Sequence, residues 1–151
     1  MDEGRTEEAV SLLEELAVKF PGSGPARAAY RKLAKAKKLA KEYDGAIAYF
    51  RKSLTADNDE LNAQTQYEIA ELYEESLDLP KAAEEYLKVS YLYGKGVFWG
   101  VRAQLKAAQI FERIDRIDDA KKLYEKLAAM DVQESEFAKK RIEWLKWRTQ
   151  K

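Results

Sequence analysis

Cysteine and histidine are both absent from this chain of 151 residues. Their absence excludes disulfides, thiolate nucleophiles, imidazole bases and zinc sites of the usual Cys/His type. No run approaches the ~18 apolar residues that a membrane-spanning helix requires. Basic and acidic residues balance at 27 each, so no net charge favours nucleic acid or an anionic membrane. We therefore expect no cofactor, no nucleic acid and no membrane insertion.

Proline is also scarce, with three residues in the whole chain. Apolar residues recur with the helical period almost everywhere, and no segment alternates like a strand. The pattern predicts eight helices, near residues 6–20, 27–42, 44–56, 62–77, 79–93, 98–114, 117–130 and 135–149. Asp44, Asp78 and Ser135 are predicted N-caps, and Pro80 is expected just inside a helix start.

Four alanines recur at nearly constant intervals of 37, 36 and 38 residues: Ala9, Ala46, Ala82 and Ala120. A large apolar residue follows each alanine by four positions: Leu13, Phe50, Tyr86 and Tyr124. Alanine lets two helix backbones approach closely, and the larger residue one turn later fills the groove beside it. A constant interval of this length indicates a stacked-repeat architecture.

The residues around these alanines fit a known pattern. One unit reads Gln66, Ile69, Ala70 and Tyr73, then Ala82 and Tyr86; the next reads Gln104, Ala107, Ala108 and Phe111, then Ala120 and Tyr124. In this spacing the chain resembles the tetratricopeptide repeat (TPR). The resemblance implies an all-α, right-handed superhelical solenoid of antiparallel helix pairs that binds other proteins without catalysis. No linker or low-complexity segment divides the helices, so we expect a single TPR-like domain over 1–151, with a half repeat at 1–22, repeats at 24–58, 61–95 and 97–132, and a terminal helix at 135–149.

The start of the chain aligns with the middle of a repeat, so we expect the chain to be a fragment of a longer protein. The repeat period exceeds the standard 34 residues, and Lys19-Phe20-Pro21-Gly22-Ser23 precedes an alanine-rich helix. In these features the chain resembles the bacterial cell-envelope TPR proteins of the Tol–Pal and outer-membrane-assembly type. That resemblance implies the periplasm or cell envelope as its location.

In TPR proteins the first helix of each pair lines a concave groove. Here the expected helix 27–42 places Arg31, Lys35 and Lys38, the basic band, at i, i+4 and i+7 on one face. The band is interpreted either as a dock for an acidic segment or as a face neutralised by a neighbouring acidic helix. The second interpretation is favoured, because charge runs on helices are usually solvated faces. Its expected partners are Glu68, Glu71, Glu74 and Glu75.

Two other groups are candidate partner-binding residues. The later first helices contribute Tyr67, Glu71, Arg102, Leu105 and Gln109 to the expected groove. Phe98 and Trp99 lie beside two glycines, as exposed binding aromatics often do. The alternative, which is favoured, is that these two aromatics begin the next helix and pack on the previous pair.

Three classes of function follow. We expect a scaffold whose groove holds a peptide or helix of a partner, with an acidic partner as one option. The alternative is self-association, either as a homo-oligomer or by end-to-end stacking, because Trp144 and Trp147 add more aromatic surface than one buried face needs. Catalysis is not expected, since acidic pairs such as Asp118 and Asp119 stand without a nucleophile, base or metal set.

Overall fold

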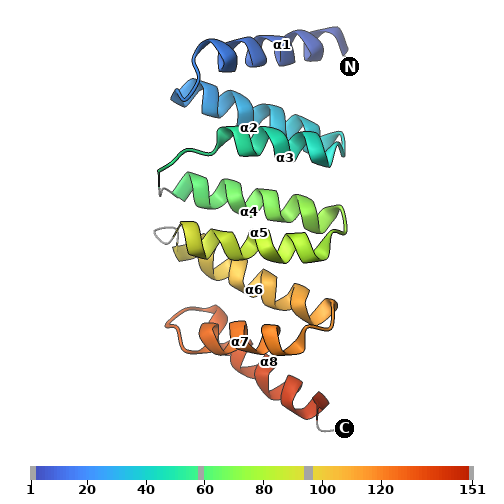
Figure 1. The fold of residues 1–151 in the computed structure, drawn as a ribbon, viewed down its shortest axis with the longest axis vertical. Helices are drawn as coiled ribbons and strands as arrows, with labels where there is room; N and C mark the ends of the chain where they lie inside the picture. Colours follow the sequence, from blue (N-terminus) through green and yellow to red (C-terminus); the bar gives the residue numbers. More distant parts are fainter. Residues whose placement is uncertain (1–2, 58–59, 94–96, 150–151) are drawn as a thin grey trace. The chain divides into compact units, whose positions relative to one another are not determined.

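The computed structural model describes residues 3–57, 60–93 and 97–149. Within these ranges it contains eight α-helices and no strand, which confirms the predicted all-α class (Figure 1). Contacts divide the chain into two compact units, Met1–Asp57 and Asn58–Lys151. The first unit holds α1 (Glu3–Lys19), α2 (Gly24–Leu39) and α3 (Tyr43–Ser53). The second unit holds α4 (Glu60–Glu75), α5 (Leu79–Leu92), α6 (Val97–Arg113), α7 (Ile117–Ala128) and α8 (Glu134–Thr149).

The same tight turn closes three helix pairs. Its central residue has a left-handed backbone although it is not glycine: Lys41 (φ 59°), Leu77 (φ 65°) and Asp115 (φ 59°). At the first turn, the amide of Lys41 donates to the carbonyl of Lys38 (2.9 Å) and the amide of Glu42 donates to that of Lys37 (3.0 Å). This is the Schellman arrangement, which satisfies the last carbonyls of a helix. Because the turn is short, α2 and α3, α4 and α5, and α6 and α7 pack as antiparallel neighbours.

The recurring alanines lie at the contacts of these pairs. Ala46, Ala82 and Ala120 are each 0% exposed, and the large residues that follow them are buried as well: Phe50, Tyr86 and Tyr124. Ala9, in α1, is exposed instead. The structure therefore confirms the close-packing role of three of the four alanines.

The helix starts differ from the prediction at several points. Asp78 does cap α5, because its carboxylate accepts a hydrogen bond from the amide of Lys81 (3.2 Å). The predictions for Asp44 and Ser135 are wrong, since both residues lie inside the first turn of a helix. α2 begins at residue 24 rather than 27, because Ser23 accepts a hydrogen bond from the amide of Ala26 and is the N-cap.

The second unit has one continuous core. α5 packs on both α4 and α6, α7 packs on both α6 and α8, and α4 also contacts α6 directly. Buried apolar residues from all five helices share this core, with alanines in every helix and large aromatic residues in α4, α5, α6 and α7. The arrangement brings the first helices of successive pairs, α4, α6 and α8, to one side of the unit, where the candidate site lies. No helix within the described ranges is long and apolar enough to cross a membrane.

Candidate functional site

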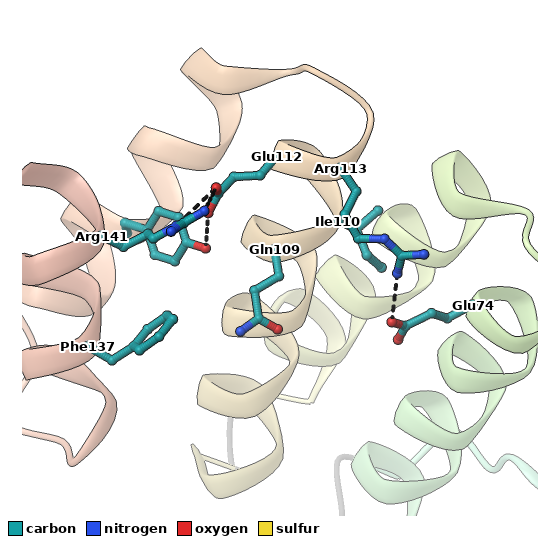
Figure 2. Close-up of a pocket in the computed structure, with 8 residues that line it drawn as sticks. Glu74, Gln109, Ile110, Glu112, Arg113, Phe137 and Arg141 are labelled. Carbon is teal, nitrogen blue, oxygen red and sulfur yellow. Dashed lines mark hydrogen bonds and ion pairs between the residues drawn. The ribbon is translucent and has the colours of Figure 1, made fainter. Parts of the chain in front are cut away.

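A groove of about 340 Å³ opens on the first-helix side of the second unit (Figure 2). We call it the Gln109 groove. It is lined by Glu74 of α4, by Gln109, Ile110, Glu112 and Arg113 of α6, by Tyr124 of α7, and by Phe137 and Arg141 of α8. Three successive first helices thus contribute side chains to a single hollow.

In α4 and in α6, a glutamate near the end of the helix accepts a hydrogen bond from a tyrosine of the following helix. The hydroxyl of Tyr86 donates to Glu74 (2.9 Å), and the hydroxyl of Tyr124 donates to Glu112 (2.6 Å). The two residues of each pair are separated by 12 positions, so the arrangement repeats with the helix pairs. Burial, and then the adjacent carboxylate, raises the pKa of both tyrosines above the usual value of 10.0.

Each of these glutamates also binds a cation on the next first helix. Glu74 of α4 contacts Lys106 and Arg113 of α6, both at 3.2 Å. Glu112 of α6 accepts hydrogen bonds from the Arg141 Nε at 2.8 Å and 3.0 Å, and from its Nη2 as well. Burial acts to raise the pKa of Glu112, but the hydrogen bonds from Arg141 and Tyr124 outweigh it and the pKa is lowered. The walls of the groove are therefore charged, but their charges are matched.

The side-chain amide of Gln109 extends between Phe137 and Glu74, and it forms no hydrogen bond with the other residues of the groove (Figure 2). Phe137 is 46% exposed and stands edge-on to Tyr124, with ring centroids 6.3 Å apart. The groove thus presents an amide that can both donate and accept, beside an accessible aromatic ring. That combination suits a peptide backbone carrying an apolar side chain.

Tyr67 and Trp99, two of the predicted binding residues, pack inside the unit. Tyr67 is 4% exposed, and its ring lies 5.1 Å from that of Tyr86 and 5.2 Å from that of Trp99. Burial raises the pKa of the Tyr67 phenol. Trp99 is half-buried against the core, as the favoured interpretation expects, whereas Phe98 at the start of the same helix remains exposed.

Phe98 and Arg102 form a more open patch on α6. Phe98 is 56% exposed, and the Arg102 guanidinium stands over its ring at 5.1 Å. Leu105 is half-buried against the core. Glu71 lines a second hollow beside the Gln109 groove, together with Glu74, Glu75, Lys106 and Arg113. Among the predicted binding residues, Gln109 alone lines the Gln109 groove.

The basic band lies on α2 of the first unit. Arg31 is only 9% exposed, with its guanidinium 5.8 Å from the ring centre of Phe50, while Lys35 is exposed and Lys38 is half-buried. Nearby, Lys37 forms an ion pair with Glu42 at 2.5 Å. Glu74, an expected partner of the band, binds the α6 cations described above.

Tyr124, Phe137 and Arg141 of the Gln109 groove were missed by the sequence analysis. The signal for Tyr124 is the 12-residue interval that it shares with the Glu74–Tyr86 pair. The signal for Phe137 and Arg141 is that α8 follows α7 as a first helix follows a second helix elsewhere in the chain. The described residues contain no cluster of three or more acidic side chains arranged to hold a metal ion.

Comparison with known proteins identifies this architecture. Residues 102–130 match the sequence model of the family described as "Tetratricopeptide repeat". No curated protein sequence matches the chain. The structure is similar to the crystal structure of nearly identical TPR-like repeats from a Podosopora anserina protein assigned as a kinesin light chain. That likeness has a TM-score of 0.61 and 16% sequence identity, and it covers 99% of this chain and 91% of the other. At this identity the likeness establishes the fold, and the comparisons lend no support to a bacterial cell-envelope type.

Proposed function

Because the chain is a tetratricopeptide-repeat protein with a solenoid-like fold, we propose that it binds a segment of another protein in the Gln109 groove. Repeats of this type generally mediate protein–protein interaction, and in this account the first helices of the second unit supply the binding surface. The partner segment lies along α6, between α4 and α8. The observation that carries the proposal is the Gln109 amide, placed beside the accessible ring of Phe137 (Figure 2).

The groove has the size and chemistry for a short peptide segment. Its volume of about 340 Å³ falls within the ~300–1,000 Å³ typical of ligand pockets. The Gln109 amide can donate a hydrogen bond to a peptide carbonyl and accept one from a peptide N–H, so it can bind a peptide backbone whatever the sequence of the peptide. Phe137 offers an apolar surface for one side chain of the ligand, so it would supply the selectivity that the amide lacks.

The groove is also held in place before a ligand arrives. Glu112 joins α6, α7 and α8 through Tyr124 and Arg141, while Glu74 joins α4, α5 and α6 through Tyr86, Lys106 and Arg113. Walls fixed in this way lose little conformational entropy on binding, which favours affinity. Because two arginines balance two glutamates in its walls, the groove disfavours neither acidic nor basic side chains of a ligand.

Two further surfaces extend the proposal. On α2, Lys35 is the exposed member of the basic band and suits an acidic side chain of a partner, because the sequence of α2 contains no acidic residue. On α6, Phe98 beneath Arg102 combines an accessible ring with a guanidinium, the residue types that dominate binding energies at interfaces. We assign acidic specificity to α2 and aromatic contacts to the Phe98–Arg102 patch.

Selection of peptides from a displayed random library tests the proposal without knowledge of the natural partner. Peptides that bind the wild type are then measured against Gln109→Ala and Phe137→Ala. Loss of the amide should weaken binding about 2- to 150-fold, because one or two hydrogen bonds of about 0.5–1.5 kcal/mol each are removed. Loss of the ring should weaken it at least about 10-fold.

Lys122→Ala provides the matched control. Lys122 lies on α7 with a side chain that is 75% exposed, and it does not line the groove. Its variant should bind the selected peptides as tightly as the wild type. Equal affinity of the wild type and both groove variants, or failure to select any binding peptide, would contradict the proposal.

A further inference from the structure

The two ends of the described chain expose complementary halves of one helix-pair contact. In α7, the apolar positions that follow the repeat alanine lie in the core of the second unit: Ala120, Leu123, Tyr124 and Leu127, of which three are 0% exposed. In α1 the residues at the same offsets from the alanine are Ala9, Leu12, Leu13 and Leu16. Ala9 is exposed, Leu12 is 60% exposed, and Leu13 and Leu16 are half-buried. α1 therefore presents the face with which a second helix packs on its first helix.

α8 presents the opposite half of the same contact. At a spacing of 37 residues, Ala138 and Leu145 occupy the positions of Val101 and Ala108 of α6, and all four are buried. Trp144 and Trp147 occupy, at the same spacing, the positions of Ala107 and Ile110.

Those two positions differ sharply in exposure. Ala107 and Ile110 are 0% and 1% exposed in α6, on which α7 packs, whereas Trp144 and Trp147 are 39% and 56% exposed. In the described part of the chain, no helix follows α8 to cover this face.

The charges of the two helices are complementary as well. The sequence of α1 contains five acidic residues and two basic ones. The sequence of α8 contains five basic residues and three acidic ones. Opposite charges of this kind steer association and fix which surfaces meet.

We propose that α1 of one copy of this chain packs on α8 of a second copy and completes a helix pair of the α6–α7 type. Ala9 lets the two backbones approach closely, and Trp144 and Trp147 of the other copy lose their exposure to water. The contact is heterologous, because each copy uses a different surface at each end. Association of this type does not stop at two copies unless the assembly closes into a ring.

The first test is the dependence of mass on protein concentration, measured by sedimentation over about 1 μM to 1 mM. The wild type should rise above the monomer mass of 17.4 kDa as concentration increases. Ala9→Arg should weaken association at least about tenfold, because it places a bulky cation against a basic helix. Its melting temperature should match that of the wild type, since Ala9 is exposed. Ala48→Arg, at an exposed alanine of α3, is the matched control and should associate like the wild type.

The second test distinguishes head-to-tail packing from symmetric pairing of two identical ends. Trp147→Glu leaves α1 intact, and Ala9→Arg leaves α8 intact. Each variant alone should stay monomeric, whereas an equimolar mixture should form dimers and nothing larger. Neither substitution touches the Gln109 groove, so this result is independent of the peptide-binding proposal.

Three outcomes would overturn the inference. A wild type that remains monomeric throughout the concentration range would leave the two faces to helices of a neighbouring segment or a different partner. A dimer of Ala9→Arg alone would indicate symmetric pairing through α8. A mixture of the two variants that stays monomeric would show that α1 and α8 do not recognise each other.

Discussion

Replacement of Glu112 by glutamine should loosen α8 from the rest of the second unit. The Glu112 side chain is 8% exposed, and it accepts hydrogen bonds from the Arg141 guanidinium and from the Tyr124 hydroxyl. Glutamine has nearly the same shape, but it presents one NH₂ group where Arg141 requires an acceptor. The substitution therefore removes the charge and places two donors face to face.

The expected loss of stability follows from the number and exposure of these bonds. A hydrogen bond to a charged group contributes about 1.5–3 kcal/mol. Arg141 is 33% exposed, so water can replace part of the hydrogen bonding that its guanidinium loses with the carboxylate. We expect the free energy of unfolding of the second unit to fall by about 2 kcal/mol. With a typical urea dependence, that loss shifts the unfolding midpoint by on the order of 1 M.

Tryptophan fluorescence is the appropriate assay, because Trp99, Trp144 and Trp147 all lie in the second unit. The Arg141 guanidinium stands 4.0 Å from the centre of the Trp144 ring, so this ring also reports the local contact. Glu125→Gln, at an exposed residue of α7, is the control and should change stability by less than about 0.5 kcal/mol. A midpoint for Glu112→Gln equal to that of Glu125→Gln would refute the role given to this carboxylate.

Three further predictions concern other parts of the account. Ala82→Glu should strongly lower the melting temperature, because it introduces a charge at a residue that is 0% exposed. Ala48→Glu, at an exposed alanine, should leave the melting temperature unchanged. Equal melting temperatures of the two variants would contradict the assigned repeat contacts. The pKa of Glu112 is lowered in the folded protein, so its contribution to stability is complete above pH 4.5, the ordinary value, and is lost as the pH falls through the lower folded value. Urea unfolding across this range should show the free energy of unfolding falling with pH. In Glu112→Gln that fall should be smaller. Gly22→Ala should destabilise the first unit by about 1 kcal/mol, because Gly22 has φ +76°, in the left-handed region that is unfavourable for alanine, whereas Gly24→Ala should not. Thermal unfolding followed by circular dichroism compares the two variants. Equal effects would contradict the backbone argument.

The periodic features of this fold could be predicted from the sequence. The alanine interval located the tight contacts at Ala46, Ala82 and Ala120, because a helix pair that must approach closely accepts little else at that position. The turns were harder to predict. Lys41, Leu77 and Asp115 adopt a left-handed backbone that sequence reasoning assigns to glycine, and their recurrence becomes visible only in the structure.

The candidate site could be predicted only in part, because the exposure of a groove residue depends on helices far away in the sequence. Tyr67 was correctly placed on a first helix, but Trp99, 32 positions later, covers it. Arg31 was expected on an open face, yet it lies against Phe50 of the next helix. Arg141 lies in the predicted terminal helix and was not among the predicted groove residues, whereas in the structure α8 forms a third wall of the Gln109 groove.

Binding of a peptide in the Gln109 groove is the central claim, and an NMR titration of the labelled chain with a selected peptide tests it most directly. Backbone amide shifts report the contact surface without any substitution in the site. We expect the largest changes at Gln109, Phe137 and Arg141, and none at Lys122 or Glu125 on the outer side of α7. The largest changes on the outer side of α7, with the three groove residues unmoved, would contradict the account.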